Sequence, residues 1–320
     1  MTNETRPNNV DAPKRPGKLG AWFLAMRPKT LTAASVPVIV GLALAWDDLA
    51  KGVASNESGA FLWVPACCCL AFALLAQVAA NFINDYADFK RGADGEERKG
   101  PARAVASGWI TPKAMLVATF LVLALACCFG LATIPYGGWT LVAVGVISCV
   151  FCLLYSAGPL PLAYIGLGDA LVIGFFGFVA VGFTYFIQTQ KISLDAALLG
   201  IAVGFATDNI LVANNYRDRD EDRASRKYTL IALLGERFGR YFYLVNGLIV
   251  LALIVFVLSR RGELVSAFSI ATLVAYLAFH WQAWRTLARI RSGAGLVKAL
   301  ALSSRNIVIL GVLLAFALAA

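Results

Sequence analysis

Two acidic clusters contain the residue types that could do chemistry, and each lies where a long apolar segment changes into a polar one. Their members recur every three or four residues, so on a helix most of them share one face. Carboxylates that point into one space repel each other strongly at low dielectric, and a hard divalent cation among them relieves that repulsion. The clusters therefore predict Mg²⁺ and a phosphate-bearing substrate. They comprise Asn81, Asn84, Asp85 and Asp88 in the first and Asn214, Asp218 and Asp222 in the second.

The elements that must position these residues are apolar helices. Hydrophobic residues make up 59% of the 320 residues, and the mean hydropathy is +0.72, well above a soluble domain. One bilayer crossing needs roughly 20 helical residues. We therefore expect an all-α integral membrane protein, a bundle of about nine transmembrane helices with a central cavity open to the cytoplasmic side. The predicted spans lie near residues 31–46, 60–80, 115–133, 139–155, 165–187, 195–213, 241–258, 264–282 and 304–320.

The orientation follows from the basic residues, because cytoplasmic loops are enriched in Lys and Arg. All but four of the 28 lysines and arginines fall in segments that nine crossings place on one side; the four are Lys51, Lys191, Arg260 and Arg261. The N-terminus and both acidic clusters are therefore predicted to be cytoplasmic and the C-terminus to lie on the opposite side. A bacterial inner membrane suits this arrangement.

Composition also argues against several classes of protein. The net charge of +9 comes from residues that flank apolar spans, which favours topology and anionic headgroups over nucleic acid. All seven cysteines lie inside apolar segments, and the single histidine, His280, stands alone beside Trp281. We expect no nucleic-acid partner and no site based on cysteine or histidine.

The domain organisation is simple. Residues 1–20 are polar and are predicted to form a disordered cytoplasmic tail, and residues 21–320 are predicted to form a single transmembrane domain. A weak repeat supports this: twice, an apolar span ends in Asn, acids follow at helical spacing, and a basic loop comes next. Two copies facing each other would line one cavity mouth. The alternative is that Asn and Asp merely end these two helices.

The sequence resembles the UbiA superfamily of intramembrane aromatic prenyltransferases from about residue 20 onward. The first signature is NDYADFKRGAD (84–94) followed by GPARAVASGWITP (100–112), and the second is NNYRDRDEDRASRKYTLIALLGE (214–236). The segments RPKTL (27–31) and YSAGPLPLAYIGLGD (155–169) are similar to the branch that prenylates 1,4-dihydroxy-2-naphthoate. So is the six-residue interval between Asp88 and Asp94. The loop at 226–230 departs from the usual pattern, with Arg226 and Tyr228 in place of glycine and arginine.

The resemblance implies the roles of the residues. Asp85 and Asp88 would hold one Mg²⁺ and Asp218 and Asp222 a second, as catalytic residues, while the amides orient carboxylates or diphosphate. Lys227 is the first candidate for diphosphate contact, although any basic residue here could equally be a solvated topological charge. The implied substrate-binding residues are Asn81, Asn84, Asp94, Arg98, Arg103, Tyr155, Asp169, Asn214, Arg217, Lys227, Arg27 and Lys29.

The implied activity is transfer of a polyprenyl group from polyprenyl diphosphate to 1,4-dihydroxy-2-naphthoate with loss of its carboxylate, within membrane lipid. Arg27 or Lys29 would hold the acceptor carboxylate, and the turn that starts at Tyr155 would form a wall for the ring, unless its Gly and Pro only punctuate two spans. Other aromatic acceptors, such as 4-hydroxybenzoate or homogentisate, remain the alternative. A carrier of a phosphorylated lipid is a further rival, but carriers commonly bind near the midplane.

Several polar and aromatic residues lie deeper in the apolar segments. Asp169 is predicted to face the bundle interior, as acids at membrane depth usually do. The run 174–183, rich in Gly and Phe, could line a groove for the isoprenoid tail or serve only helix packing. Asp208 and Asn209 are predicted to face the cavity, without an assigned role.

Overall fold

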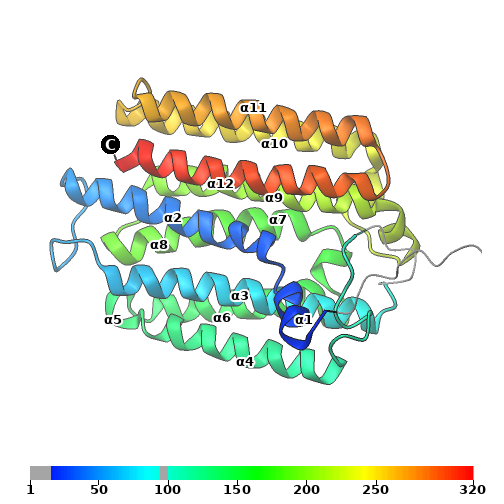
Figure 1. Ribbon diagram of the computed structural model, residues 1–320. Helices are drawn as coiled ribbons and strands as arrows, with labels where there is room; N and C mark the ends of the chain where they lie inside the picture. The colour runs from blue at the N-terminus through cyan, green and yellow to red at the C-terminus, as the bar shows by residue number, and fades with distance from the viewer. Residues whose placement is uncertain (1–15, 94–99, 320) are drawn as a thin grey trace, which may run out of the picture.

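The computed structural model describes residues 16–93 and 100–319, and this part of the chain contains helices and no strand. Figure 1 shows the long helices running side by side. The elements are α1 (Lys18–Ala25), α2 (Pro28–Ala50), α3 (Trp63–Lys90), α4 (Pro112–Leu131), α5 (Ile134–Gly137), α6 (Thr140–Ser156), η1 (Leu162–Tyr164), α7 (Gly168–Val172), η2 (Ile173–Val179, a π-helix), α8 (Ala180–Thr189), α9 (Leu194–Ala224), α10 (Leu230–Arg261), α11 (Ala267–Ile290), η3 (Ala294–Leu296) and α12 (Val297–Ala319).

The predicted all-helical membrane class is confirmed. In the described part of the chain, seven helical segments are long and apolar enough to cross a bilayer: α2, α3, α4, the run α7–η2–α8, α9, α10 and the run η3–α12. The two remaining predicted spans coincide with α6, an apolar helix of 17 residues, and α11, a helix of 24 residues. The count of nine crossings therefore stays a prediction. Residues 18–20, assigned to the tail from the sequence, already belong to α1.

The order of packing places both acidic clusters at one end of the bundle. α9 packs against α10, α12 and η2, and α2 packs against α12, α8 and α3. In Figure 1, α10 and α11 form one side of the bundle and α3, α4 and α6 the other, while α1 lies beside the end at which α3 and α9 finish. The largest apolar core joins α2, α8, α9, α10, α11 and α12. Below we call the end that holds both clusters the acidic end.

Glycines set the closest contact inside the bundle. A Cβ on Gly177 would stand 2.4 Å from the carbonyl oxygen of Gly200, and a Cβ on Gly204 would stand 2.7 Å from that of Ile173. Because no side chain intervenes, the π-helix η2 lies directly against the backbone of α9. This contact positions η2 and its phenylalanines beside α9.

The opposite end of the bundle is closed by one arginine. The Arg261 guanidinium is almost fully buried and pairs with four carboxylates, those of Asp47, Asp48, Asp195 and Glu263. These carboxylates come from α2, α9 and the turn after α10. Arg261 therefore ties three segments together where the helices are farthest from the acidic clusters.

The glycine contact predicts a difference between two substitutions in one segment. Gly177→Ala places a methyl group against the α9 backbone and should lower stability by about 1–3 kcal/mol, the usual cost of overpacking. Gly182→Ala is the matched control, because a Cβ there meets no atom within 4 Å. The unfolding midpoint of the detergent-solubilised protein measures both. Equal midpoints would contradict the close packing of η2 on α9.

Candidate active site

One cavity of about 630 Å³ lies inside the bundle and joins the two acidic clusters. The four aspartates Asp85, Asp88, Asp218 and Asp222 line it, and each has at most 6% of its surface exposed. The cavity continues between apolar side chains as far as Thr133, just before α5, and Ile187, near the end of α8. Figure 1 shows α5 at the end of the bundle opposite the acidic end. The cavity is therefore polar at the acidic end and apolar along its length.

The first cluster is held by the loop that follows it. Both carboxylate oxygens of Asp85 accept backbone hydrogen bonds, from the N–H groups of Ala104 at 3.0 Å and Val105 at 3.3 Å. Asp88 accepts a hydrogen bond from the Tyr164 hydroxyl at 2.9 Å, and the Arg103 guanidinium lies 3.8 Å from its second oxygen. The loop thus folds back over α3 and keeps both carboxylates in the cavity wall.

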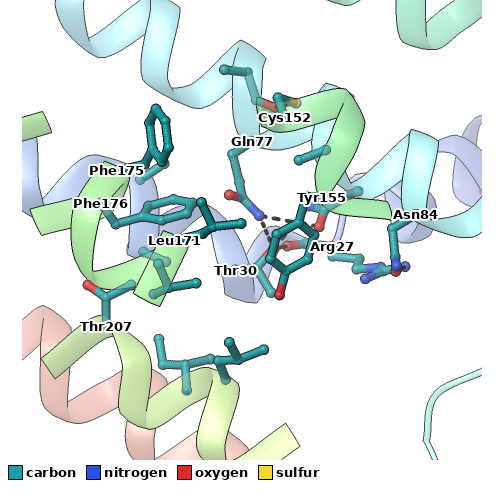
Figure 2. A pocket seen from close by; sticks show the side chains of 18 of the residues that line it. Arg27, Thr30, Gln77, Asn84, Cys152, Tyr155, Leu171, Phe175, Phe176 and Thr207 are labelled. Carbon is teal, nitrogen blue, oxygen red and sulfur yellow. Dashed lines mark hydrogen bonds between the residues drawn. The ribbon is translucent and has the colours of Figure 1, made fainter. Parts of the chain in front are cut away.

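The asparagines of the first cluster hold the start of α2. Asn81 donates hydrogen bonds to the carbonyl oxygen of Met26 and to the Thr30 hydroxyl. Asn84 accepts one from Arg27 at 2.9 Å and donates one to Ser156. Arg27 has a left-handed backbone, with φ of 51°, a conformation that is strained for a side chain of this size and is often found at functional sites. These contacts direct the Arg27 guanidinium toward the cavity (Figure 2).

The second cluster carries its own cations. The Arg217 guanidinium donates two hydrogen bonds to Asp218, at 2.5 and 2.6 Å, and a third to Asn214 at 2.8 Å. The Lys227 ammonium lies 3.2 Å from one oxygen of Asp222. The other oxygen of Asp222 is buried and has no hydrogen-bond partner among the described residues. The simplest explanation for such an oxygen is that it binds a cation or a hydrogen-bond donor of a ligand.

Lys227 stays charged in this position. Burial by itself lowers the pKa of the ammonium group, but the neighbouring carboxylates of Asp222, Asp88 and Asp218 outweigh burial and raise the pKa. A charged lysine among acids of both clusters could contact an anionic leaving group directly.

Tyr164 connects the two clusters, and sequence reasoning missed it. Its hydroxyl bonds Asp88 of the first cluster, and the Lys227 ammonium lies 5.7 Å from its ring centroid. Its carbonyl oxygen accepts the Tyr228 N–H at 2.9 Å, and Arg91 lies over the same ring. Burial and Asp88 raise the pKa of the phenol, so the hydroxyl remains a donor. Only its place in the segment 155–169 hinted at a role.

The cavity collects the predicted residues. Every candidate within the described residues lines it, whereas Asp94 and Arg98 lie outside the described residues. As they stand, no three acidic, His or Cys side chains of the described residues are grouped closely enough to hold a metal ion. The cavity-lining candidates are Arg27, Lys29, Asn81, Asn84, Asp85, Asp88, Arg103, Tyr155, Asp169, Asn214, Arg217, Asp218, Asp222 and Lys227.

The predictions for the deeper residues are confirmed in part. Of the run 174–183, Phe175, Phe176 and Phe183 line the cavity, as a groove requires, while Phe178 is exposed on the outside of the bundle. Figure 2 shows Phe175 and Phe176 beside Leu171 on this wall. The expectation that Asp208 and Asn209 face the cavity is wrong, because both are buried and neither lines it. Helical periodicity alone could not tell which neighbouring helices these two side chains of α9 pack against.

The bundle encloses a cavity with acidic clusters at one end and an apolar extension at the other. Such a site is typical of an intramembrane enzyme whose substrate has a charged head and an apolar tail. The comparisons with known proteins agree with this class. The chain belongs to the UbiA prenyltransferase family, whose sequence profile matches residues 34–304.

Relatives and solved structures extend the match over most of the chain. It is 32% identical to a 1,4-dihydroxy-2-naphthoate octaprenyltransferase of Haemophilus influenzae over 81% of this chain and 80% of that protein. It is 35% identical to the Escherichia coli protein of that name, over 73% and 75%. A UbiA homolog from Aeropyrum pernix has a TM-score of 0.63 at 15% identity over 86% and 96% of the two chains, which establishes the shared fold.

Tyr164 generates a prediction about the coupling of the clusters. Tyr164→Phe removes the hydrogen bond to Asp88 but keeps the ring under Lys227, so prenyltransferase kcat/KM should fall about tenfold, as for the loss of one hydrogen bond to a charged group. Steady-state kinetics at varied Mg²⁺ would measure this. Tyr228→Phe is the matched control, because Tyr228 bonds Tyr164 through its backbone N–H, which the substitution keeps, and its side chain is exposed. An unchanged Tyr164→Phe enzyme would contradict the coupling.

Proposed function

We propose that this protein transfers a polyprenyl group from polyprenyl diphosphate to 1,4-dihydroxy-2-naphthoate, with decarboxylation, to give demethylmenaquinone in menaquinone biosynthesis. The observation that carries the proposal is a single cavity with four aspartates at one end and an apolar extension at the other. The relatives named 1,4-dihydroxy-2-naphthoate octaprenyltransferase, from three further bacteria besides the two above, support the acceptor.

The donor set fits Mg²⁺. Carboxylate oxygens are the ligands that this hard cation prefers, and it is usually shared between a few carboxylates and substrate phosphates. The oxygen of Asp222 that has no partner among the described residues is available for such a ligand. We assign one ion to Asp85 and Asp88 and a second to Asp218 and Asp222, with Asp94 as an outer member. A family neighbour from Archaeoglobus fulgidus was solved with GPP and Mg²⁺, which supports this use of the acids. The metal would neutralise charge on the diphosphate as its bond to the prenyl group breaks.

The chain supplies fixed cations for the same leaving group. Lys227, Arg103 and Arg217 line the acidic end of the cavity, and we assign them, with Arg98, to the diphosphate. Each now pairs with an aspartate. A bound diphosphate would share these cations, because charge-assisted donors placed where negative charge develops stabilise a transition state strongly.

The acceptor ring would lie between this end and the apolar wall. Arg27 and Lys29 line the cavity at the start of α2, and we assign them to the acceptor carboxylate. Tyr155 lines the same region, with Phe175 and Phe176 beyond it (Figure 2). Asn84 holds Arg27 in place and Asn214 holds Arg217; with Asn81, we assign them to orienting the carboxylates or the diphosphate. The isoprenoid tail would occupy the apolar extension, where water is excluded and the allylic cation is protected.

The protein is an integral membrane protein, and we further propose that it forms one domain in a bacterial inner membrane with the acidic end toward the cytoplasm. The bias of Lys and Arg toward that end supports this orientation. Both substrates would then meet at the cytoplasmic side, and the C-terminus would lie opposite.

The metal assignment predicts selective losses. Asp85→Asn or Asp218→Asn should lower pyrophosphate release by on the order of 10²–10³-fold, since each removes charge needed at the leaving group. Purified protein in detergent, with Mg²⁺ and a long prenyl diphosphate, would be offered dihydroxynaphthoate, 4-hydroxybenzoate or homogentisate in parallel, with and without EDTA.

Asp220→Asn serves as the control, because Asp220 is an exposed acid in the same stretch and does not line the cavity. Its activity should equal that of the unmodified protein. Release with another ring in place of the naphthoate would overturn the acceptor, and no release with any ring would overturn the proposed reaction. Release that persists in EDTA would overturn the metal.

A further inference from the structure

A third acidic feature lies deeper than the two clusters. Asp169, in the first turn of α7, lines the cavity although only 3% of its surface is exposed. Its Oδ1 atom has no hydrogen-bond partner among the described residues. A buried carboxylate oxygen without a donor is costly, and the residue that carries this one lines the space in which a substrate would bind.

A second carboxyl group backs Asp169. Asp208 on α9 is completely buried behind the cavity wall, and one of its oxygens accepts a hydrogen bond from the Asn246 side chain at 2.9 Å. The two carboxyl groups lie within hydrogen-bonding reach of each other. Within the described residues, neither forms an ion pair with lysine or arginine. Two adjacent carboxylates repel each other strongly in such a setting, and one proton shared between them would relieve that repulsion.

The pair is separate from the diphosphate end. Asp208 precedes Asp218 by ten residues on α9, which corresponds to about 15 Å along a helix. Tyr155 lies near the pair: a Cβ on Gly168, the neighbour of Asp169, would stand 3.4 Å from the Tyr155 hydroxyl. In the view of Figure 2, Tyr155 projects into the cavity between Arg27 and Asn84 on one side and Phe175 and Phe176 on the other.

We propose, on the premise of the function above, that Asp169 is a catalytic residue that takes the proton of a ring hydroxyl of the phenolic acceptor, and that Asp208 is a positioning residue that shares this proton. The site would thus recognise an aromatic ring that carries a hydroxyl group next to the ring carbon that attacks the prenyl group. Asp169 becomes the base, and the phenylalanines beyond it supply the apolar side of the ring pocket.

Every bond broken in the proposed reaction is matched by a bond formed or by a leaving group. The carbon–oxygen bond of the allylic diphosphate breaks, and its electron pair leaves with the diphosphate. The ring carbon that bears the carboxylate forms the new bond to the prenyl group while the hydroxyl proton passes to the Asp169–Asp208 pair, which leaves a neutral ketone. The carbon–carboxylate bond then breaks, carbon dioxide leaves, the electron pair returns to the ring, and the pair gives the proton back to the ring oxygen.

This balance explains why the base can be buried. Because the prenyl group replaces a carboxylate on the ring and not a hydrogen, no net proton has to leave the site. A carboxyl pair that stores the hydroxyl proton during the reaction is therefore a sufficient base. A phenol without that carboxylate would release a proton for each turnover, and the pair, with 3% of Asp169 and none of Asp208 exposed, is poorly placed to pass it to water. The pair therefore favours acceptors that lose carbon dioxide.

The test separates the base from a structural role. Asp169→Asn should lower kcat with dihydroxynaphthoate by about 10²–10⁴-fold, the usual contribution of a general base, and leave the KM for prenyl diphosphate within about threefold. The acceptor in which the ring hydroxyl is a methyl ether should react slowly with unmodified protein. With the ether as acceptor, Asp169→Asn and the unmodified protein should have the same kcat, because the ether and the substitution remove the same interaction.

Two further variants guard against misfolding. Asp169→Glu keeps the carboxylate and should recover kcat at least tenfold over Asp169→Asn, and Asp208→Asn should lower kcat about tenfold at unchanged KM. Gel filtration in detergent and the KM for prenyl diphosphate report an intact fold, with Asp220→Asn as the control. Equal losses in the hydroxyl and ether reactions, a raised KM for prenyl diphosphate, or unchanged kcat in Asp169→Asn would overturn the proposal.

Failure of the underlying function gives a different result. If the unmodified protein transfers no prenyl group to any phenol, the proposed function falls. If it transfers the group and Asp169→Asn does so at the same rate, only the role of Asp169 falls.

Discussion

Burying several carboxylates inside a membrane bundle is the constraint on which the rest of the structure depends. Removing one ionised carboxylate from water costs several kcal/mol unless donors or cations replace the water. Each acid of this site receives a different replacement. Asp85 has two backbone N–H groups, Asp88 a phenol, Asp218 a guanidinium and Asp222 an ammonium. The acids persist because these partners are built into the fold.

That requirement makes the loops part of the active site. The donors for Asp85 come from the loop after α3, the phenol comes from η1, and the ammonium comes from the turn between α9 and α10. Tyr164 contacts partners from both clusters and accepts the N–H of Tyr228, so η1, the end of α3 and the turn between α9 and α10 meet at this end. One oxygen of Asp222 has no partner in the part of the chain that the structure describes and could accept a ligand.

At the other end of the bundle, buried charges are also paired, but there one cation is surrounded by several carboxylates. There Arg261 is surrounded by four carboxylates, and no cavity of the main site reaches it. The glycine contact between η2 and α9 lies between the two ends and holds the aromatic wall in place. The molecule is thus rigidly paired at one end and ready for a substrate at the other.

Local features of the sequence determined the class, the helices and the two acidic faces by themselves, because apolar length and spacing of three and four residues act within one segment. The same spacing brought Asp85, Asp88, Asp218 and Asp222 to the right faces. Only the tertiary structure decided that Tyr164 joins the clusters and that Asp208 is buried behind Asp169 instead of lining the cavity itself. Those contacts depend on how separate helices and loops rotate against each other, which no periodicity within one segment specifies.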